Sequence, residues 1–566
     1  MDIFSQIGIM FIISAAGAFV ARLIRQPLIP AYILAGILLG PVFGIITGSD
    51  VIITMSEIGI AFLLFVVGLE MNIRKIKDIG LFAIVGGTMQ MAFVFIAGFW
   101  IALLIGFVKI EAIYIGLIVA FSSTMIVVKI LSDRREIDTL HGRIIIGILL
   151  MQDIIALFVL SLLATGDSFQ PLAILFSILK GFGLFALAFI SSEVLFPPIF
   201  KFAARSQELL FLVSLGVCFL FSIALSYAGF SIIIGAFIAG ISLANLPYNI
   251  EIIGRVRSIK DFFATLFFVS LGLELVLTNL RSIILPLIMF SFVVLIVKPF
   301  IIIVICAVAR YTKRNSFLAS ISLAQISEFS LIIVAEGLLL GHVSRDLFSL
   351  TVLLAVITIT ATSYLMQFEL KIFSFLSKYL TPFDMAATTE QLQYIPENLE
   401  YDFILIGYDR IGYGIFKMLE KARKTFLVVD FNPDIVKKLA IKKIPCLYGD
   451  IGDPEILERL NLKKTGFVVS TVPGVEDNII IIKKVKHENP RAAVFVTATV
   501  IDEALILYKE GADYVILPHF LGGERVSSLI EEIKGDHKKL NITKLEHITD
   551  LKTRMELEHV HPREGR

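Results

Sequence analysis

The feature that most constrains this chain is a succession of apolar runs that fills its first part. Up to about residue 380 the runs follow one another with short polar connections, and charged residues become frequent only after that point. A helix of about 20 apolar residues spans the hydrocarbon core of a bilayer. Hydrophobic residues make up 57% of the 566-residue chain and charged residues 17%, which excludes a soluble globular protein. The sequence therefore predicts a polytopic α-helical membrane domain followed by a polar domain.

Thirteen candidate membrane helices follow from the length criterion. They lie near residues 5–24, 29–47, 52–71, 80–106, 111–131, 142–164, 171–195, 207–228, 230–246, 260–276, 282–309, 316–340 and 345–367. Basic residues gather in every second connection, and short basic loops stay on the cytoplasmic side of a membrane. We therefore expect a multi-pass protein of the cell (plasma or inner) membrane with its N-terminus outside and its C-terminal domain in the cytoplasm.

An internal repeat relates the two halves of the apolar region. The segments ILAGILLG and LFVVGLEM in the first half resemble FIAGISLA and FFVSLGLEL in the second. Gly240 and Gly272 follow Gly36 and Gly68 by the same 204 residues. This offset maps the first six runs onto the last six and leaves 171–195 as an unpaired linker, so the second copy is inverted. Inverted repeats are the architecture of alternating-access secondary transporters.

Small polar residues mark matching places in the two copies. The fifth run contains AFSSTMIVV at 120–128, and its repeat mate is LAQISEFSL at 323–331. Ion sites in such transporters lie where interrupted helices cross near the bilayer midplane, and hydroxyls suit a helix break. This predicts an ion path lined by Ser122, Ser123 and Thr124, with Glu328 as a gate or stabiliser. The alternative is that these hydroxyls only bond back to the preceding turn or allow close helix packing.

Two further polar residues stand side by side in the sixth run. Gln152 and Asp153 lie near its middle, where a charge costs roughly 2.5–3.5 kcal/mol on insertion scales. A carboxylate can bind a cation or a proton, and competition between them is the simplest device for coupled exchange. We therefore predict that Gln152 and Asp153 form the ion site, with the Gln152 amide in place of a second charge. Lys298, in the eleventh run, has two interpretations: an ion-pair partner of Asp153, or a participant in the coupling.

The segments AYILAGILLGP, SEIGIAFLLFVVGLEM, AFSSTMIVVKIL, LLMQDIIAL, GAFIAGISLAN, FFVSLGLEL and AQISEF, in this order, resemble the Kef-type (glutathione-regulated potassium-efflux-like) branch of the monovalent cation/proton antiporters. The resemblance implies a thirteen-helix fold, a homodimer, a core domain that moves against a dimerisation domain, and an ion-site aspartate at Asp153. Electrogenic sodium/proton relatives have two adjacent aspartates there. This chain has Gln152 before Asp153, as the Kef-type potassium systems do. AQISEF departs from the glycine-rich run that precedes the glutamate in Kef proteins.

The C-terminal part alternates short apolar strands with helical segments, a pattern typical of a doubly wound parallel sheet. Gly407 and Gly412 occupy the ends of a GxGxxG-like turn after the first strand, and Asp430 lies where a ribose-binding acid belongs. Asp409 replaces the middle glycine, which adds bulk and negative charge where phosphates would lie. The domain resembles the TrkA-N (RCK) regulatory domains of potassium channels and transporters, which match also at Gly449 and Asp450.

This resemblance implies a gating dimer that binds an adenine nucleotide, AMP, ADP or NAD(H), through Gly407, Gly412, Asp430 and Asp450. A domain that has lost its ligand, and a purely structural dimerisation module, are the alternatives. Three widely separated cysteines give neither a disulfide frame nor a metal cluster. The predicted domains are an exchanger domain at 1–380, a linker at 381–398, a Rossmann-like regulatory domain at 399–535 and a charged tail at 536–566.

The sequence as a whole favours a secondary transporter that exchanges a monovalent cation, K+ before Na+, for H+ by alternating access. A Na+/H+ antiporter is the first alternative. A ligand-gated K+ channel is a weaker one, because the chain lacks a filter sequence of the TVGYG kind. A membrane-anchored dehydrogenase is disfavoured by Asp409 and by the lack of a second catalytic domain. We therefore expect no enzyme activity, and partners limited to the ions, membrane lipid and a second copy, without nucleic acid.

Overall fold

The computed structural model divides the chain into two compact units, Met1–Ala387 and Thr388–Arg566. The residues that it describes are 2–24, 26–46, 50–70, 80–133, 140–163, 183, 190–227, 232–276, 280–383, 393–396, 400–408, 411–430, 432–449, 451–452, 454–533, 544 and 547–549. Most of the predicted tail, most of the predicted linker and most of the seventh predicted membrane run lie outside these residues. Each unit is described below by itself.

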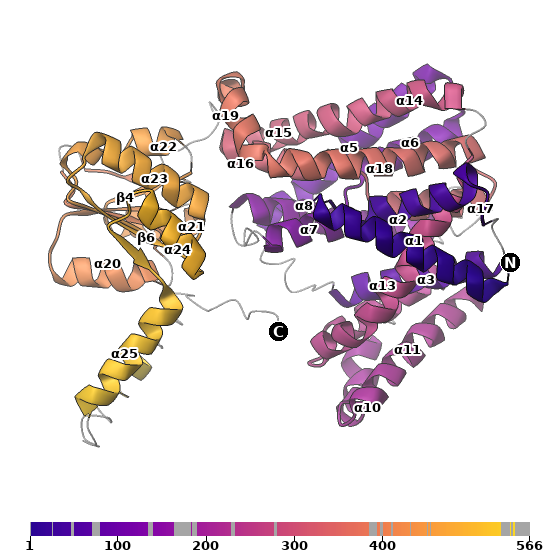
Figure 1. Ribbon diagram of the computed structural model, residues 1–566, viewed down its shortest axis with the longest axis horizontal. Coiled ribbons are helices and arrows are strands. Elements are labelled where there is room, and N and C mark those ends of the chain that lie inside the picture. Colours follow the sequence, from indigo (N-terminus) through magenta and orange to yellow (C-terminus); the bar gives the residue numbers. More distant parts are fainter. Residues whose placement is uncertain are drawn as a thin grey trace. The chain divides into compact units, whose positions relative to one another are not determined.

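The first unit is entirely helical in its described residues (Figure 1). Its α-helices are α1 (Ile3–Leu23), α2 (Leu28–Ile37), α3 (Asp50–Glu70), α5 (Gly80–Ile105), α6 (Lys109–Ala120), α7 (Thr124–Asp133), α8 (Leu140–Leu163), α10 (Phe196–Ala203), α11 (Gln207–Tyr227), α12 (Ile232–Ala244), α13 (Asn249–Leu273), α14 (Leu280–Phe292), α15 (Lys298–Val308), α16 (Lys313–Ser322), α17 (Glu328–Leu339), α18 (Arg345–Gln367) and α19 (Glu369–Leu380). Short π-helical segments lie at Leu38–Val42, Ser191–Leu195 and Val293–Val297. Within the described residues, seven segments are long and apolar enough to cross a membrane.

Apart from the seventh run, most of which lies outside the described residues, the predicted membrane runs coincide with helices, with differences at the tenth, the fifth and the twelfth. The tenth run was predicted to begin at residue 260, whereas α13 begins at Asn249 and extends through the polar segment that precedes the apolar one. The length of the apolar run therefore predicted only the part of the helix that can lie in lipid. The fifth and twelfth predicted runs are each two helices, α6 with α7 and α16 with α17, separated by non-helical residues. These two interruptions carry the candidate site.

Two close helix crossings connect the repeats in a reciprocal way. A Cβ atom added to Gly36 of α2 would lie 2.9 Å from Gly272 Cα of α13 and 2.0 Å from Val269 O. A Cβ atom added to Gly68 of α3 would lie 3.0 Å from Gly240 Cα of α12. Gly36 and Gly240 are repeat mates, as are Gly68 and Gly272. An exchange of the two repeats therefore turns one crossing into the other, as an inverted repeat requires.

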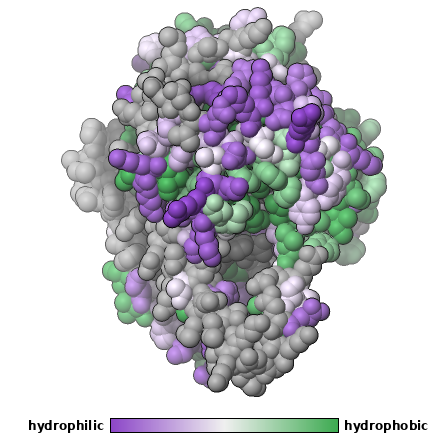
Figure 2. Space-filling model, turned by 90° about the vertical axis from the view of Figure 1, so that its left-hand side faces the viewer, coloured by the Kyte–Doolittle hydropathy of each residue, from purple (hydrophilic) through white to green (hydrophobic). Residues whose placement is uncertain are grey.

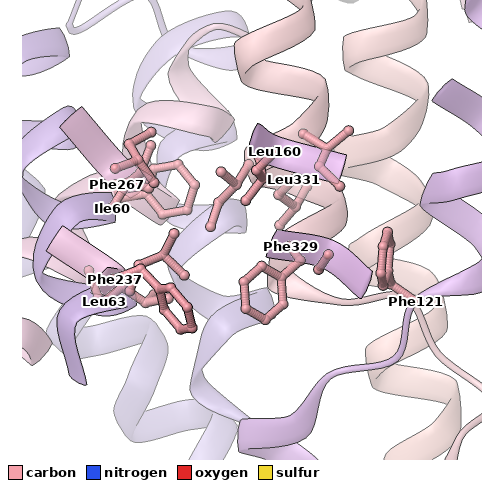
Figure 3. Packing of buried hydrophobic residues seen from close by; sticks show 14 of the residues in the cluster. Ile60, Leu63, Phe121, Leu160, Phe237, Phe267, Phe329 and Leu331 are labelled. Carbon is pink, nitrogen blue, oxygen red and sulfur yellow. The ribbon is translucent and has the colours of Figure 1, made fainter. Parts of the chain in front are cut away.

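An apolar layer lies between these crossed helices and the helices that carry the interruptions. Figure 3 shows its side chains in two facing groups, and all belong to one buried cluster. Ile60, Leu63, Phe237 and Phe267 come from α3, α12 and α13, and Leu160, Phe329 and Leu331 come from α8 and α17. Burial of large apolar side chains stabilises by about 1.5–3 kcal/mol each relative to water. The layer thus joins two helix groups within one unit.

The second unit is built around a seven-stranded sheet with the order β1-β4-β3-β2-β5-β6-β7. Strands β2 to β7 pair in parallel with one another. At one edge of the sheet, β1 (Gln393–Tyr394) pairs antiparallel with β4, and the sequence did not predict this strand. The parallel strands are β2 (Phe403–Ile406), β3 (Phe426–Asp430), β4 (Cys446–Tyr448), β5 (Phe467–Ser470), β6 (Ala493–Thr497) and β7 (Tyr514–Ile516). The predicted doubly wound parallel sheet is confirmed.

Helices complete the second unit and carry much of its surface. They are α20 (Ile411–Lys421), α21 (Pro433–Ile441), α22 (Pro454–Glu458), α23 (Val475–Glu488), α24 (Ile501–Lys509) and α25 (Pro518–Ile533). Two buried clusters lie in this unit; one includes Ile404, Val468 and Val494, and the other includes Leu405, Val428 and Phe416. Hydrophilic residues, purple in Figure 2, spread over the face seen there.

Candidate functional site

The two helix interruptions lie at the same place in the two repeats and contact each other. α6 ends at Ala120 and α7 begins at Thr124, while α16 ends at Ser322 and α17 begins at Glu328. The Ser122 hydroxyl donates to Leu323 O at 3.0 Å, so the two non-helical segments meet. An interruption leaves backbone N–H and C=O groups without helical partners, and lipid offers none. The surrounding side chains therefore have to supply them.

Glutamine side chains satisfy the first interruption. Gln152 Oε1 accepts from Ser122 N at 2.8 Å, and Gln152 Nε2 donates to Gln90 Oε1 at 2.6 Å. Gln90 Nε2 in turn donates to Ala120 O at 3.3 Å. Both glutamines are fully buried. The Gln152 amide is thus engaged at both ends, which suits a residue that holds the interruption open.

Threonine hydroxyls do the same work in the second interruption. Ile326 N donates to Thr358 Oγ1 at 3.3 Å, and Thr362 Oγ1 donates to Ala324 O. Ala324 and Ile326 are the repeat mates of Ala120 and Ser122. The same two backbone groups are therefore satisfied in both repeats, by amides in one and by hydroxyls in the other.

Lys298 joins the two interruptions. Its ammonium group donates to Phe121 O at 2.7 Å and to Gln325 O at 2.9 Å, and the side chain is fully buried. These carbonyls lie just beyond the C-terminal ends of α6 and α16, where helix dipoles are negative and stabilise a cation. Among the described contacts, Lys298 forms no ion pair with Asp153, so the ion-pair interpretation of Lys298 is wrong. A hydrophobic pattern locates a lysine on a helix but does not tell which carbonyl it reaches.

Asp153 is a residue of α8, and its carboxylate contacts Thr124, the first residue of α7. The Thr124 hydroxyl is 3.0 Å from Asp153 Oδ1 and 3.1 Å from Oδ2, and Asp153 is 3% exposed. A helix N-terminus favours a negative charge. A carboxylate has about four acceptor sites, and one hydroxyl proton occupies only one of them. The remaining lone pairs can bind a cation or a proton.

Glu328 of the second repeat occupies the position that Thr124 has in the first. It is the first residue of α17, is 3% exposed, and interacts with the Ser123 hydroxyl and with the Met125 backbone at the start of α7. Ser123 also accepts from Ile126 N at 3.4 Å, so it caps α7. The predicted residues Ser122, Ser123, Thr124, Gln152, Asp153, Lys298 and Glu328 are thus brought together around the two interruptions.

Gln325 is a further polar residue of the second interruption. Its side chain is fully buried, and among the described atoms neither its Oε1 nor its Nε2 has a hydrogen-bond partner. An unsatisfied buried amide group costs about 1–3 kcal/mol. The sequence did not predict a role for Gln325, Gln90, Thr358 or Thr362. Gln90 could have been found as an isolated amide in an apolar run, whereas the threonines resemble ordinary helix residues.

The turn after β2 in the second unit has the backbone that its glycines predict. Gly407 has φ +87°, and a Cβ atom added to Gly412 would lie 1.9 Å from Gly407 O. Asp430 at the end of β3 accepts from Tyr408 N and from Asn432 N, each at 2.8 Å. Burial raises the pKa of Tyr408 to about 12, so its phenol is neutral near pH 7. Asp409 and Asp450 lie outside the described residues.

Comparison with protein families matches most of the chain. The model of the transmembrane sodium/hydrogen exchanger matches residues 9–368, which is more than half of the chain. The chain belongs to the sodium/hydrogen exchanger family. The TrkA-N domain model matches residues 403–518 of the second unit. The first unit is therefore the exchanger domain of a multi-pass cation/proton antiporter, and the second is a TrkA-N domain.

Individual relatives cover one or both domains. The chain is 25% identical to the glutathione-regulated potassium-efflux system protein KefC of Cronobacter sakazakii, over 94% of this chain and 86% of KefC. It is 25% identical to the putative cation/proton antiporter YbaL of Escherichia coli, over 88% and 92% of the two chains. It is 29% identical to K(+) efflux antiporter 5 of Arabidopsis thaliana over 60% of this chain, and spans 61% of that relative's length. The predicted resemblance to Kef-type antiporters is confirmed.

The exchanger fold also occurs among solved structures. The sodium proton antiporter MjNhaP1 of Methanocaldococcus jannaschii matches with a TM-score of 0.50 at 16% identity, over 67% of this chain and 97% of that one. At this identity the match concerns the fold alone. The predicted fold class, a polytopic helical exchanger domain followed by a Rossmann-like domain, is confirmed.

Proposed function

We propose that this exchanger moves potassium against protons and that the Asp153 carboxylate binds the two ions in turn. The observation that carries the proposal is the position of Asp153: it is almost completely buried, and Thr124 contacts it at the N-terminal end of an interrupted helix. An ionisable group inside a membrane protein is functional by default. Cation and proton compete for the same oxygens, so each ion displaces the other.

The neutral neighbour of Asp153 supports an electroneutral cycle. Gln152 is engaged by Ser122 N and by Gln90, so it contributes structure and no charge. With one titrating carboxylate in each cycle, one cation exchanges for one proton. Glu328, the first residue of α17, contacts Ser123 and Met125 at the start of α7 and so keeps the two interruptions together. Thr124 can turn its hydroxyl oxygen toward a bound cation once the carboxylate no longer accepts its proton.

Potassium is preferred to sodium because of the relatives and of the site composition. Two of the relatives are named for potassium efflux. The Asp153 carboxylate has the Thr124 hydroxyl beside it, whereas the carbonyls of Phe121 and Gln325 already accept from Lys298. A larger, more weakly hydrated cation gives up its water more readily to such ligands, since a small cation needs stronger compensation for its lost hydration. Na+/H+ exchange is the alternative function.

The TrkA-N domain regulates this exchange from the cytoplasm in our proposal. Gly407, Gly412 and Asp430 form a turn that can receive an adenine nucleotide, AMP, ADP or NAD(H). Asp430 already holds the turn through Tyr408 N, so a nucleotide ribose would use its remaining acceptor sites. The basic loops favour an outside N-terminus, and the exchanger works as a homodimer in the lipid bilayer.

The decisive experiment measures ion-driven proton movement in proteoliposomes. A potassium gradient should drive proton flux in the wild-type protein, and Asp153→Asn should reduce it by about 100-fold or more, because the amide can bind neither ion in exchange for the other. Asp346→Asn makes the same chemical change in the first turn of α18 and should retain flux. Flux driven by sodium alone would refute the choice of potassium. Potassium flux without proton coupling that survives Asp153→Asn would refute antiport.

The regulatory part is tested on the same vesicles with the TrkA-N domain facing the buffer. AMP, ADP and NADH are added one at a time, and the rate of potassium-driven proton flux is recorded for the wild type and for Asp430→Asn. A nucleotide that changes the wild-type rate and not the variant's supports the proposed site. Rates that none of the three nucleotides changes would refute nucleotide gating and leave the exchange assignment intact.

A further inference from the structure

Helix α19 follows the last membrane helix and is fixed to the exchanger domain by one of its faces. α18 ends at Gln367 and α19 runs over Glu369–Leu380. Phe373 and Leu380 are buried in a cluster with Phe317 and Ile321 of α16, and the Phe317 and Phe373 rings are 5.6 Å apart. α16 is the first half of the second interrupted helix. α19 thus packs on the element that leads directly to the interruption.

The opposite face of α19 is aromatic and exposed. Phe368 is 45% exposed, Phe375 78% and Tyr379 74%. With Lys371 these residues follow one another at spacings of three, four and four, so they lie along one side of a helix. The Lys371 ammonium is 5.7 Å from the centre of the Phe368 ring. Leaving a large apolar side chain in water forfeits about 1.5–3 kcal/mol, so this stripe requires an apolar partner.

The direction of α19 indicates that partner. Figure 1 shows α19 running across the direction of α15 and α18. α18 is among the helices long and apolar enough to cross a membrane, so a helix that lies across its end lies along the membrane surface. A helix with aromatic and basic residues on one side, in continuity with a membrane helix, has the composition of an interfacial helix. Lys371 matches the negative charge of anionic lipid headgroups.

We propose that α19 lies on the lipid surface, with Phe368, Phe375 and Tyr379 at the boundary of headgroups and acyl chains. Its other face holds α16 through Phe373. The bilayer surface therefore sets the depth of α16, and with it the depth of the second interruption. The occupant of the aromatic face is an anionic phospholipid leaflet; another segment of this chain or a second copy would be a different occupant.

The test is depth-dependent fluorescence quenching of the full-length protein in vesicles. Trp100 is the single tryptophan of the chain and is replaced first, by Trp100→Phe. In that background Phe375→Trp and Tyr379→Trp place the probe on the aromatic face, and Phe373→Trp places it on the buried face. Phosphatidylcholine vesicles with phosphatidylglycerol contain either ordinary lipids or lipids brominated near the top of the acyl chains. Acrylamide is the quencher in water.

We expect brominated lipid to quench about half of the fluorescence at positions 375 and 379, and clearly less at 373, because the boundary region brings bromine and ring together. Removing phosphatidylglycerol, or adding Lys371→Gln, should lower the quenching at both positions. Strong quenching by acrylamide with little quenching by brominated lipid would overturn the proposal, because the face would then be in water. Protection from both quenchers would overturn it too, because protein would then cover the face. Two probe positions guard against one variant that fails to fold.

Discussion

The two helix interruptions share a backbone plan and differ in their side chains. In the first, Gln90 and Gln152 satisfy the freed groups, and Thr124 contacts Asp153. In the second, Thr358 and Thr362 satisfy the corresponding groups. The comparison separates two kinds of residue. The residues of the first kind satisfy corresponding backbone groups in both repeats, whereas Asp153, which Thr124 contacts, has Ile357 at its repeat position.

Charge is arranged in the same way at both interruptions. The carbonyls that follow α6 and α16 both accept from Lys298. The first turn of α7 is contacted by Asp153, and α17 begins with Glu328. This arrangement follows the helix dipoles, which are negative at C-terminal ends and positive at N-terminal ends. The inverted repeat thus places four half-helix ends together, and divergence of side chains turns one of them into the ion site.

The largest expected effect concerns the glycine crossings, where the repeats have not diverged. Gly36→Ala and Gly240→Ala each force a Cβ atom into backbone, 2.0 Å from Val269 O and 2.2 Å from Phe65 O. Each should lower the free energy of unfolding by more than about 3 kcal/mol, as severe overpacking does. The measurement is the thermal unfolding midpoint in detergent. Gly216→Ala, with nothing within 4 Å of the added atom, is the control. Unequal effects of the two repeat mates would break the claimed equivalence.

The next effect is at the shared cation. Lys298→Met leaves Phe121 O and Gln325 O without their donor in both interruptions at once. We expect a loss of about 2–4 kcal/mol, because unsatisfied buried carbonyls retain their desolvation cost. Unfolding midpoints and proton flux should fall together. Lys109→Met, on an exposed helix end, is the matched control. A Lys298→Met variant of unchanged stability would show that the interruptions do not need this bridge.

A smaller effect distinguishes the two ways of satisfying an interruption. Gln152→Leu removes the acceptor of Ser122 N and the donor to Gln90, whereas Thr358→Val removes only the acceptor of Ile326 N among the contacts between elements. We expect a loss of about 2–3 kcal/mol for the first and about 1 kcal/mol for the second. Both are measured by thermal unfolding of purified protein. Equal losses would mean that Gln152 stabilises its interruption no more than Thr358 stabilises the other.

The smallest effect has the opposite sign. Gln325→Leu replaces an amide that has no partner among the described atoms by an apolar group of similar size. The unfolding midpoint should rise, by an amount that corresponds to about 1 kcal/mol, since an unsatisfied group is removed. Gln90→Leu, which breaks two hydrogen bonds, should lower it. A Gln325→Leu variant that is less stable than wild type would show that the amide has a partner in the membrane.

The inverted repeat of the exchanger domain and its helix interruptions could be predicted from the sequence, but only part of the site could. The 204-residue offset predicted both the inverted repeat and the position of the interruptions, because glycine and small polar residues are constrained by backbone approach and by helix breaks. Asp153 was predicted as the site by the cost of a charge in lipid, and its transport role remains a prediction. Gln152 was predicted as part of the ion site, whereas its amide bonds to Ser122 N and to Gln90 in the structure. A side-chain amide can bind an ion or a backbone group, and residue type does not decide between them.

Contacts between residues far apart in the sequence could not be predicted, for a physical reason. Lys298 contacts Phe121 across 177 residues and Gln325 across 27. Periodicity assigns a side chain to a face of its own helix but says nothing of the partner that the fold brings to that face. The same limit applies to Thr358 and Thr362, whose apolar neighbours conceal them. In the TrkA-N domain, by contrast, the glycine turn was predicted from local spacing alone.

The reciprocal glycine crossings have a consequence for biosynthesis. Gly36 and Gly68 meet Gly272 and Gly240, which the ribosome reaches only some 170 to 240 residues later. At the usual 5–20 residues per second, the narrow glycine faces of α2 and α3 would wait roughly 9–47 s in the membrane before their partners emerge. During that interval they can be covered only by lipid, by the insertion machinery or by a wrong helix. The glycine faces of the newly made first half therefore have to be kept from wrong contacts until the second half is inserted.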